Sequence, residues 1–162
     1  TNAKFIKGTS GTTLDAIARN TLWNENLNYN HGTGHGVGYL GNIHEPPTGF
    51  RWYVVPSKNE HHKLEEGMVM TDEPGIYEDG KFGIRIENEF IVQKGTKNKY
   101  GQFMYLETIT FAPIDLDGID PEEMSKDEIQ WLNNYHKDVY DKISPALNEE
   151  EKAWLKQYTR AI

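Results

Sequence analysis

The sequence contains no cysteine. Disulfide bonds, a cysteine nucleophile and a thiolate metal site are therefore excluded, while the redox compartment stays open, with the cytoplasm favoured. Long apolar runs are also missing: the longest has four residues, at Trp52–Val55 and again at Phe103–Leu106. A stretch of that length forms neither a membrane span nor the core of a signal peptide.

Basic residues are few, with 17 Lys and Arg against 25 Asp and Glu, so the formal net charge is −8. An acidic chain without a basic stripe argues against binding to nucleic acid or to an anionic membrane surface. Hydrophobic residues make up 36% and aromatic residues 12% of the 162 positions, too many for a disordered chain. We therefore expect one packed domain, or part of one.

The first part of the chain predicts a helix over Leu14–Trp23, with Thr12 or Thr13 as its N-cap. The residues that this spacing places on the buried face are Leu14, Ile17, Ala18, Thr21 and Leu22. Between Asn30 and Gly41, glycines stand at positions 32, 34, 36, 38 and 41. Each glycine costs a helix about 1 kcal/mol relative to alanine, so this segment is a loop or an irregular strand.

Strands follow the glycine-rich segment. Short apolar or alternating runs predict strands over Met68–Thr71, over Gly83–Val92 and over 103–111. The first ends at the turn sequence 72–75, and a hairpin-type turn at Asp79-Gly80 precedes the second. Together with the helices, these strands predict a mixed α+β architecture.

The last part of the chain is acidic and helical. Ser125 and Glu128 have capping-box spacing, and they predict a helix over 126–143. The side chains expected to pack this helix on the body are Ile129, Leu132, Val139 and Ile143. The layout is therefore an α/β body over residues 1–114 and a helical extension over residues 115–162.

One histidine pattern and one glycine pattern resemble known motifs, but both lack the neighbouring secondary structure that those motifs need. His31 and His35 are four residues apart, but the glycines between them exclude the helix that a zincin requires. The segment Gly36–Gly41 fits G-x-G-x-x-G, yet Pro46 and Pro47 follow where a dinucleotide site needs a helix. Neither pattern predicts a site by itself.

The acids are more informative. Glu73 lies where a strand ends in a Pro-Gly turn, and Glu87 lies inside an apolar strand, where an unpaired carboxylate is costly to bury. By period two, Arg85, Glu87 and Glu89 share one face. Two interpretations stay open: a solvent face of alternating charge, or convergence of Glu87 with Glu73 and His35 on a metal.

Four motifs occur in order along the chain: His31-Gly-Thr-Gly-His35-Gly-Val-Gly, Asn42-Ile-His44-Glu45-Pro46, Thr71-Asp72-Glu73-Pro74-Gly75 and Gly83-Ile-Arg85-Ile-Glu87-Asn88. This set resembles the C-terminal part of Xaa-Pro aminopeptidase (aminopeptidase P), one of the pita-bread metallopeptidases that include methionine aminopeptidase and prolidase. The resemblance covers nearly the whole chain. It implies the second half of the α+β pita-bread fold, with a curved antiparallel sheet, flanking helices and a helical C-terminal extension.

The resemblance also implies a metal site. His35, Glu73 and Glu87 match three of the family's five ligands to two divalent ions, with Glu87 in the bridging position. Carboxylates and one imidazole suit Mn²⁺ or Co²⁺, with Zn²⁺ as a further possibility, and a pair of such ions can generate hydroxide. The implied activity is hydrolysis of the Xaa-Pro bond in peptides with proline in second position.

Three further side chains match substrate-side positions of the family. His31 and His44 match histidines that contact the substrate, and Arg85 matches an arginine beside the bridging glutamate, suited to keeping that carboxylate ionised. In this scheme Glu73 shuttles the proton, and His44 stabilises the developing charge. The resemblance further implies a homodimer and a cytoplasmic location.

One departure from the family is large. Its two aspartate ligands lie upstream, and the only aspartate before His35 here is Asp15, which matches a helix motif. We therefore expect this chain alone to bind metal weakly and to hydrolyse no Xaa-Pro peptide. The alternatives are a metal-free pita-bread module that binds peptides, and a dimerisation module that uses the aromatic tail.

Overall fold

The structure, a computed structural model, describes residues 3–55 and 62–162. Internal contacts divide the chain into two compact units, Thr1–Thr110 and Phe111–Ile162. The sequence placed this division a few residues later, after residue 114. No helix within the described ranges is long and apolar enough to cross a membrane.

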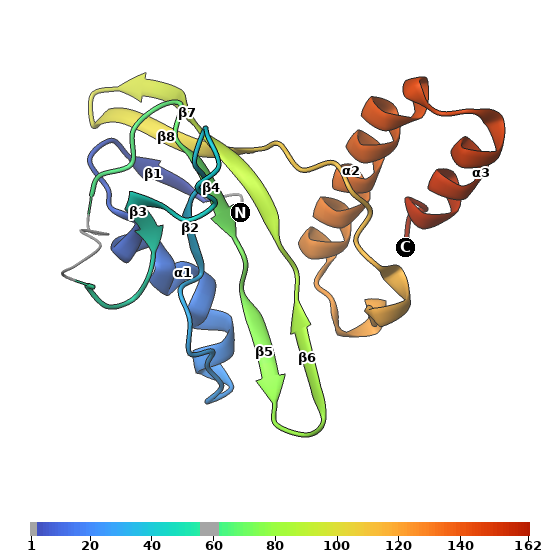
Figure 1. Cartoon of the computed structure of the whole chain (residues 1–162), viewed down its shortest axis with the longest axis horizontal. Helices are drawn as coiled ribbons and strands as arrows, with labels where there is room; N and C mark the ends of the chain where they lie inside the picture. The colour runs from blue at the N-terminus through green and yellow to red at the C-terminus, as the bar shows by residue number, and fades with distance from the viewer. Residues whose placement is uncertain (1–2, 56–61) are drawn as a thin grey trace. The chain divides into compact units, whose positions relative to one another are not determined.

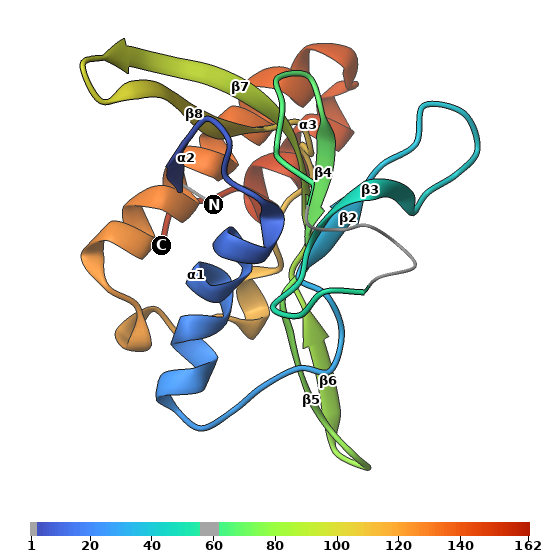
Figure 2. The ribbon, with the colours of Figure 1, turned by 90° about the vertical axis from the view of Figure 1, so that its left-hand side faces the viewer.

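The first unit is an antiparallel sheet with one helix against it. Six strands pair in the order β1-β8-β7-β4-β2-β3, and β5 pairs with β6 separately. The elements are β1 (Lys4–Ile6), α1 (Gly11–Asn24), β2 (Gly34–Gly36), β3 (Glu45–Phe50), β4 (Val69–Asp72), β5 (Gly75–Glu78), β6 (Phe82–Arg85), β7 (Asn88–Asn98) and β8 (Gly101–Thr108). The β5–β6 hairpin extends from the ends of β4 and β7 as a two-stranded arm (Figure 1), and α1 lies on one side of the larger sheet (Figure 2).

Helix α1 buries a different face from the one that apolar spacing predicts. Its buried residues are Gly11, Leu14, Asp15 and Arg19. Ile17, on the predicted apolar face, is 59% exposed. Leu14 joins the core of the unit, whose other buried members are Phe5, Phe50, Leu64, Met70, Val92 and Met104. The predicted face is right for Leu14 and wrong for Ile17, because the buried face extends instead to two charged residues that pair with each other, Asp15 and Arg19.

The start of α1 also differs from the prediction. Its N-cap is Ser10, not Thr12 or Thr13. The helix begins with its backbone pressed on β3, since a Cβ added at Gly11 would stand 2.0 Å from the carbonyl oxygen of Gly49. Only glycine fits such a close approach of two backbones.

The strand predicted over Gly83–Val92 is two strands. β6 ends at Arg85 and β7 begins at Asn88, so Ile86 and Glu87 lie outside both. Side chains alternate between faces only within a continuous strand, and the period-two relation between Arg85 and Glu87 is therefore lost. Glu87 therefore lies in the break between the two strands.

The other strand predictions are confirmed with shifted ends. β4 takes the place of the strand predicted from Met68, and β8 ends at Thr108, before the predicted end at residue 111. The turn at Asp79-Gly80 joins β5 to β6, with Gly80 at a φ of 72°. A positive φ of this size favours glycine, which explains the local sequence.

The second unit is helical. Its elements are the 3₁₀ turns η1 (Leu116–Gly118), η2 (Pro121–Glu123) and η3 (Ser144–Ala146), and the helices α2 (Lys126–Ile143) and α3 (Glu149–Tyr158). The predicted bounds of α2 are confirmed, and its capping box is formed by Ser125 and Glu128. Leu132 and Val139 are buried in the unit's own core, with Leu116, Tyr135 and Leu155.

Candidate functional site

One pocket of the first unit gathers most of the predicted site residues. It lies where β2, β3, β6 and the end of β4 meet. The residues that line it are His31, Gly32, Gly34, His35, His44, Glu45, Pro46, Thr48, Arg51, Glu73 and Arg85. Of the six side chains to which the sequence assigned a role, five are in this set, and Glu87 is not.

His35 and Glu73 form the centre of the pocket. The Nε2 atom of His35 lies 3.3 Å from Oε1 of Glu73, and their side chains are 15% and 14% exposed. Pairing of β2 with β4 brings them together: the His35 amide donates to the Thr71 hydroxyl at 3.0 Å, and that hydroxyl donates to Glu73 Oε1 at 3.2 Å. The Glu73 amide in turn donates to the Thr33 carbonyl at 2.6 Å.

The tautomer of His35 follows from its other ring nitrogen. Nδ1 lies 3.0 Å from the Gly36 carbonyl oxygen, which can only accept, so Nδ1 carries the proton. In the neutral ring Nε2 then presents a lone pair toward the oxygen of Glu73. Two lone pairs facing each other at this distance repel, unless a proton or a metal cation lies between them. A backbone carbonyl behind the ring is also the usual support of a metal-binding histidine.

Arg85 occupies the other side of Glu73. Its Nη1 lies 3.6 Å from Glu73 Oε2, and its Nε donates to the Tyr77 hydroxyl at 3.0 Å. The hydrogen bond to Tyr77, and then the Glu73 and Glu87 carboxylates, raise the pKa of Arg85 above its ordinary value. The two oxygens of Glu73 therefore face different partners, an imidazole and a guanidinium.

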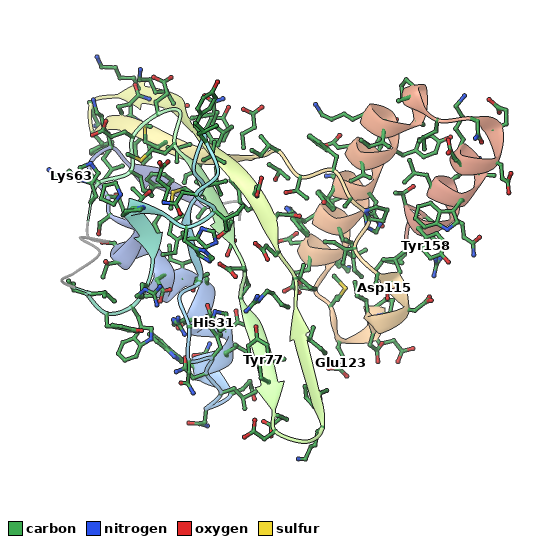
Figure 3. All side chains as sticks on the ribbon, viewed as in Figure 1. His31, Lys63, Tyr77, Asp115, Glu123 and Tyr158 are labelled. Carbon is green, nitrogen blue, oxygen red and sulfur yellow. The ribbon has the colours of Figure 1, made fainter. Side chains whose placement is uncertain are left out.

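Tyr77 connects Arg85 to His31. Its hydroxyl lies 3.0 Å from His31 Nε2, and His31 Nδ1 lies 2.7 Å from the Gly32 carbonyl. Figure 3 labels the His31 and Tyr77 side chains, which lie near each other in the first unit. Because Nδ1 must donate to that carbonyl, Nε2 accepts the Tyr77 proton, while the Tyr77 oxygen accepts from Arg85. This chain of hydrogen bonds fixes the orientation of the His31 ring.

The sequence analysis missed Tyr77. A Cβ at Gly75 would stand 2.4 Å from its hydroxyl oxygen, and a Cβ at Gly83 would stand 3.0 Å from its ring. Two glycines flanking a tyrosine, one on the same strand and one paired with it across the hairpin, were the available signal.

His44 lies beside the central pair. Its ring centroid is 4.2 Å from that of His35, with 43° between the ring planes. The residue is exposed, in the segment that joins β2 to β3. A group in this position can reach a molecule bound next to His35 and Glu73.

The structure does not bring Glu87 to the other two predicted ligands. It is exposed, in the two-residue break between β6 and β7. Among the residues of the described ranges, no three histidine or acidic side chains are grouped so that they could hold a metal ion. The expected convergence of three ligands is therefore not found. The residues present fit two ligands, His35 and Glu73, and do not fit a full dinuclear site.

Asp72, next to Glu73 in the chain, has a carboxyl group with a perturbed pKa. Burial raises the pKa of its carboxyl group, and the negative charges of Asp15 and Glu73 raise it further. Asp72 lines a separate pocket with Asp15 and Thr33. Acidic groups thus lie on both sides of the β4 end.

Comparisons with known proteins show the family to which the chain is similar. Residues 2–94 match the model of metallopeptidase family M24, and residues 102–162 match that of the C-terminal region of peptidase M24. The chain is 46% identical to aminopeptidase P1 of Arabidopsis thaliana over 99% of its length, and 47% identical to the probable Xaa-Pro aminopeptidase P of Pyrenophora teres f. teres over 96%. It spans about a quarter of the length of these relatives, 25% and 24% respectively.

A solved structure gives the same result for the fold. The X-prolyl aminopeptidase of Caenorhabditis elegans, described as a cytosolic enzyme with a di-nuclear active site, superposes with a TM-score of 0.87 at 34% identity. The match covers 99% of this chain and 26% of that one. The predicted α+β pita-bread fold is confirmed. Because the family model covers more than half of the residues, the chain belongs to metallopeptidase family M24.

Proposed function

We propose that this chain contributes part of the catalytic centre of a metal-dependent Xaa-Pro aminopeptidase. The observation that carries the proposal is the His35–Glu73 pair, with Nε2 of one facing Oε1 of the other at 3.3 Å. The Nδ1–H bond to the Gly36 carbonyl leaves the Nε2 lone pair available for a cation. A metal at this position would polarise the scissile carbonyl and supply a nucleophile near neutral pH.

The other pocket residues would act on the peptide and on protons. Glu73, with one oxygen facing His35 and the other facing Arg85, is suited to accept and release a proton during the reaction. His44, whose ring lies beside that of His35, would donate a hydrogen bond to the peptide. His31, whose two ring nitrogens are engaged by the Gly32 carbonyl and by Tyr77, would contact the peptide through its ring. Glu87 stays a proposed bridging ligand on the family resemblance alone.

Several finer assignments belong to the proposal. The substrate would be a peptide with proline in second position, since the relatives are named for that specificity. The site in a whole enzyme would hold two divalent ions, with Mn²⁺ favoured over Co²⁺ and Zn²⁺ by the hard oxygen ligands. A homodimer and a cytoplasmic location are further expectations from the resemblance.

Metal binding by this chain is the direct test. We would titrate it with Co²⁺, following the visible absorbance and the heat of binding. Weak binding is expected, and it should be lost in both His35→Gln and Glu73→Gln. Glu89→Gln is the matched control, because it neutralises a half-buried carboxylate outside the pocket. If the chain binds no Co²⁺, or if all three variants bind as the wild type does, the metal proposal is wrong.

Activity separates the enzyme from a binding module. The chain should hydrolyse no Xaa-Pro-Pro peptide in excess Mn²⁺ when it is alone. Addition of the separately expressed N-terminal part of the Arabidopsis aminopeptidase P1 should supply the missing ligands and give activity that Glu73→Gln abolishes. The rival is a metal-free module that binds peptides. Peptide binding without metal and without hydrolysis in the mixture would support that rival.

A further inference from the structure

A charged pair is buried in α1, away from the pocket. Nε of Arg19 donates to Oδ2 of Asp15 at 2.6 Å, and both side chains are 0% exposed. Replacing a buried ion pair by apolar residues is often neutral or stabilising, so stability alone explains such a pair poorly. What the pair contacts gives a better explanation.

The guanidinium of Arg19 ties down the segment that leads into the pocket. Nη1 donates to the Asn28 side chain at 2.9 Å and to the Tyr29 carbonyl at 2.8 Å, and Nη2 donates to the His31 carbonyl. The guanidinium also lies over the Tyr29 ring, 3.9 Å from its centroid. One side chain thus fixes the backbone from residue 28 to His31, whose ring faces the pocket.

The carboxylate of Asp15 reaches the same segment from its other oxygen. The Thr33 hydroxyl donates to Oδ1 of Asp15 at 2.6 Å, and it also contacts the Tyr29 hydroxyl. The Thr33 carbonyl accepts the amide proton of Glu73 at 2.6 Å. Thr33 therefore links Asp15, through its hydroxyl, to the backbone of Glu73, through its carbonyl.

We propose that the buried Asp15–Arg19 pair positions His31 and Glu73 in the pocket. Neither member touches a substrate or a metal, and the proposal rests on the proposed function of the pocket. Arginine suits this role because its rigid fork holds three acceptors on one segment at fixed angles, whereas lysine offers a single flexible ammonium. These contacts account for the burial of two charged side chains, which stability alone explains poorly.

The test compares Arg19→Lys, which keeps the charge and loses the fork, with Met104→Ala. Met104 is 1% exposed, in the core of the same unit, and is not a pocket residue, so its variant controls for lost stability. The first measurement is hydrogen exchange of the Glu73 amide in the metal-free chain. It is compared with the Val92 amide, which bonds to the Met68 carbonyl in the sheet and reports opening of the unit.

In Arg19→Lys, the protection of Glu73 should fall at least about tenfold more than that of Val92, while in Met104→Ala the two should fall together. Co²⁺ affinity should fall about 10–100-fold in Arg19→Lys, the usual effect of losing an outer partner of a metal ligand, and stay unchanged in Met104→Ala. Should Arg19→Lys fail to fold, Thr33→Val, which removes one hydroxyl group, serves in its place.

The outcomes separate the two proposals. Equal loss of protection at Glu73 and Val92 in the substituted chain overturns the positioning role, whatever the metal does. A wild-type chain that binds no Co²⁺ refutes the metal proposal, and the exchange measurement then still decides whether the pair orders the pocket. Unchanged Co²⁺ affinity in Arg19→Lys, with wild-type binding intact, also counts against positioning.

Discussion

Gly34 is the point at which β2 is packed most tightly on β4. A Cβ built on it would stand 1.9 Å from the Thr71 carbonyl oxygen and 2.9 Å from Cδ2 of Phe50. Both neighbours are fixed, one by the backbone of β4 and the other by its place in the core. Gly34→Ala therefore forces the two strands apart just before His35.

The cost can be worked from these contacts. Ordinary van der Waals contact needs at least 3.4 Å, so the strands must separate by more than an ångström. The hydrogen bond from the His35 amide to the buried Thr71 hydroxyl, now 3.0 Å long, would then break. Overpacking costs about 1–3 kcal/mol and a buried group left unbonded about 1–3 kcal/mol more. Gly34→Ala should thus lose about 2–6 kcal/mol, a large part of a typical stability of 5–15 kcal/mol.

The assay is urea unfolding followed through resolved amide signals of the first unit. Gly95→Ala, in β7 of the same unit, is the matched control, because a Cβ there meets its nearest atoms at an ordinary contact distance of 3.5 Å and no left-handed φ opposes it. That control should be neutral or stabilising by up to about 1 kcal/mol. The close packing of β2 on β4 would be refuted if Gly34→Ala unfolded at the wild-type urea concentration with its His35 amide signal unmoved.

Three further predictions concern the second unit. Leu132→Ala removes a side chain that is 2% exposed and should cost about 2–5 kcal/mol in urea unfolding; a loss below 1 kcal/mol would show a loosely packed core. The hydroxyl and then the amide of Ser125 lower the pKa of Glu128 below its ordinary 4.5, so their stabilisation exists above that pH and is lost as the pH falls. Glu128→Gln should therefore lower the melting temperature at pH 7 and leave it unchanged at pH 2. Burial lowers the pKa of His136 below 6.5, so the unfolded chain binds a proton that the folded unit excludes. Stability should then decline as the pH falls below 6.5, and His136→Leu should remove that part of the slope.

The sequence predicted correctly those boundaries of helices and turns that depend only on a few neighbouring residues. The capping box of Ser125 and Glu128 gave the start of α2, and Asp79-Gly80 gave the hairpin. The break after Arg85 carries no such signal, because apolar and charged residues go on alternating through it. Only the pairing of β6 with β5, and of β7 with β4, decides that the strand is interrupted.

The order of the motifs along the chain was enough to predict which residues form the site. It was not enough to predict the buried polar contacts that hold them. The resemblance selected His35 and Glu73, yet their approach depends on the register that pairs Gly36 with Met70. The buried face of α1 could not be read from hydropathy, since Asp15 and Arg19 are charged and become buried only as partners. A pattern of apolar residues cannot reveal a polar network that satisfies itself.

The two cores described above share no residue. Residues that share one core unfold together, so two separate cores can unfold in two transitions. Calorimetric data on this chain should therefore be fitted to two transitions before they are fitted to one. An enthalpy derived from the steepness of a single fitted transition would then be smaller than the heat that the calorimeter measures. A ligand of the pocket should raise the melting temperature of the sheet unit only. The melting temperature of the helical unit then serves as an internal reference in binding experiments.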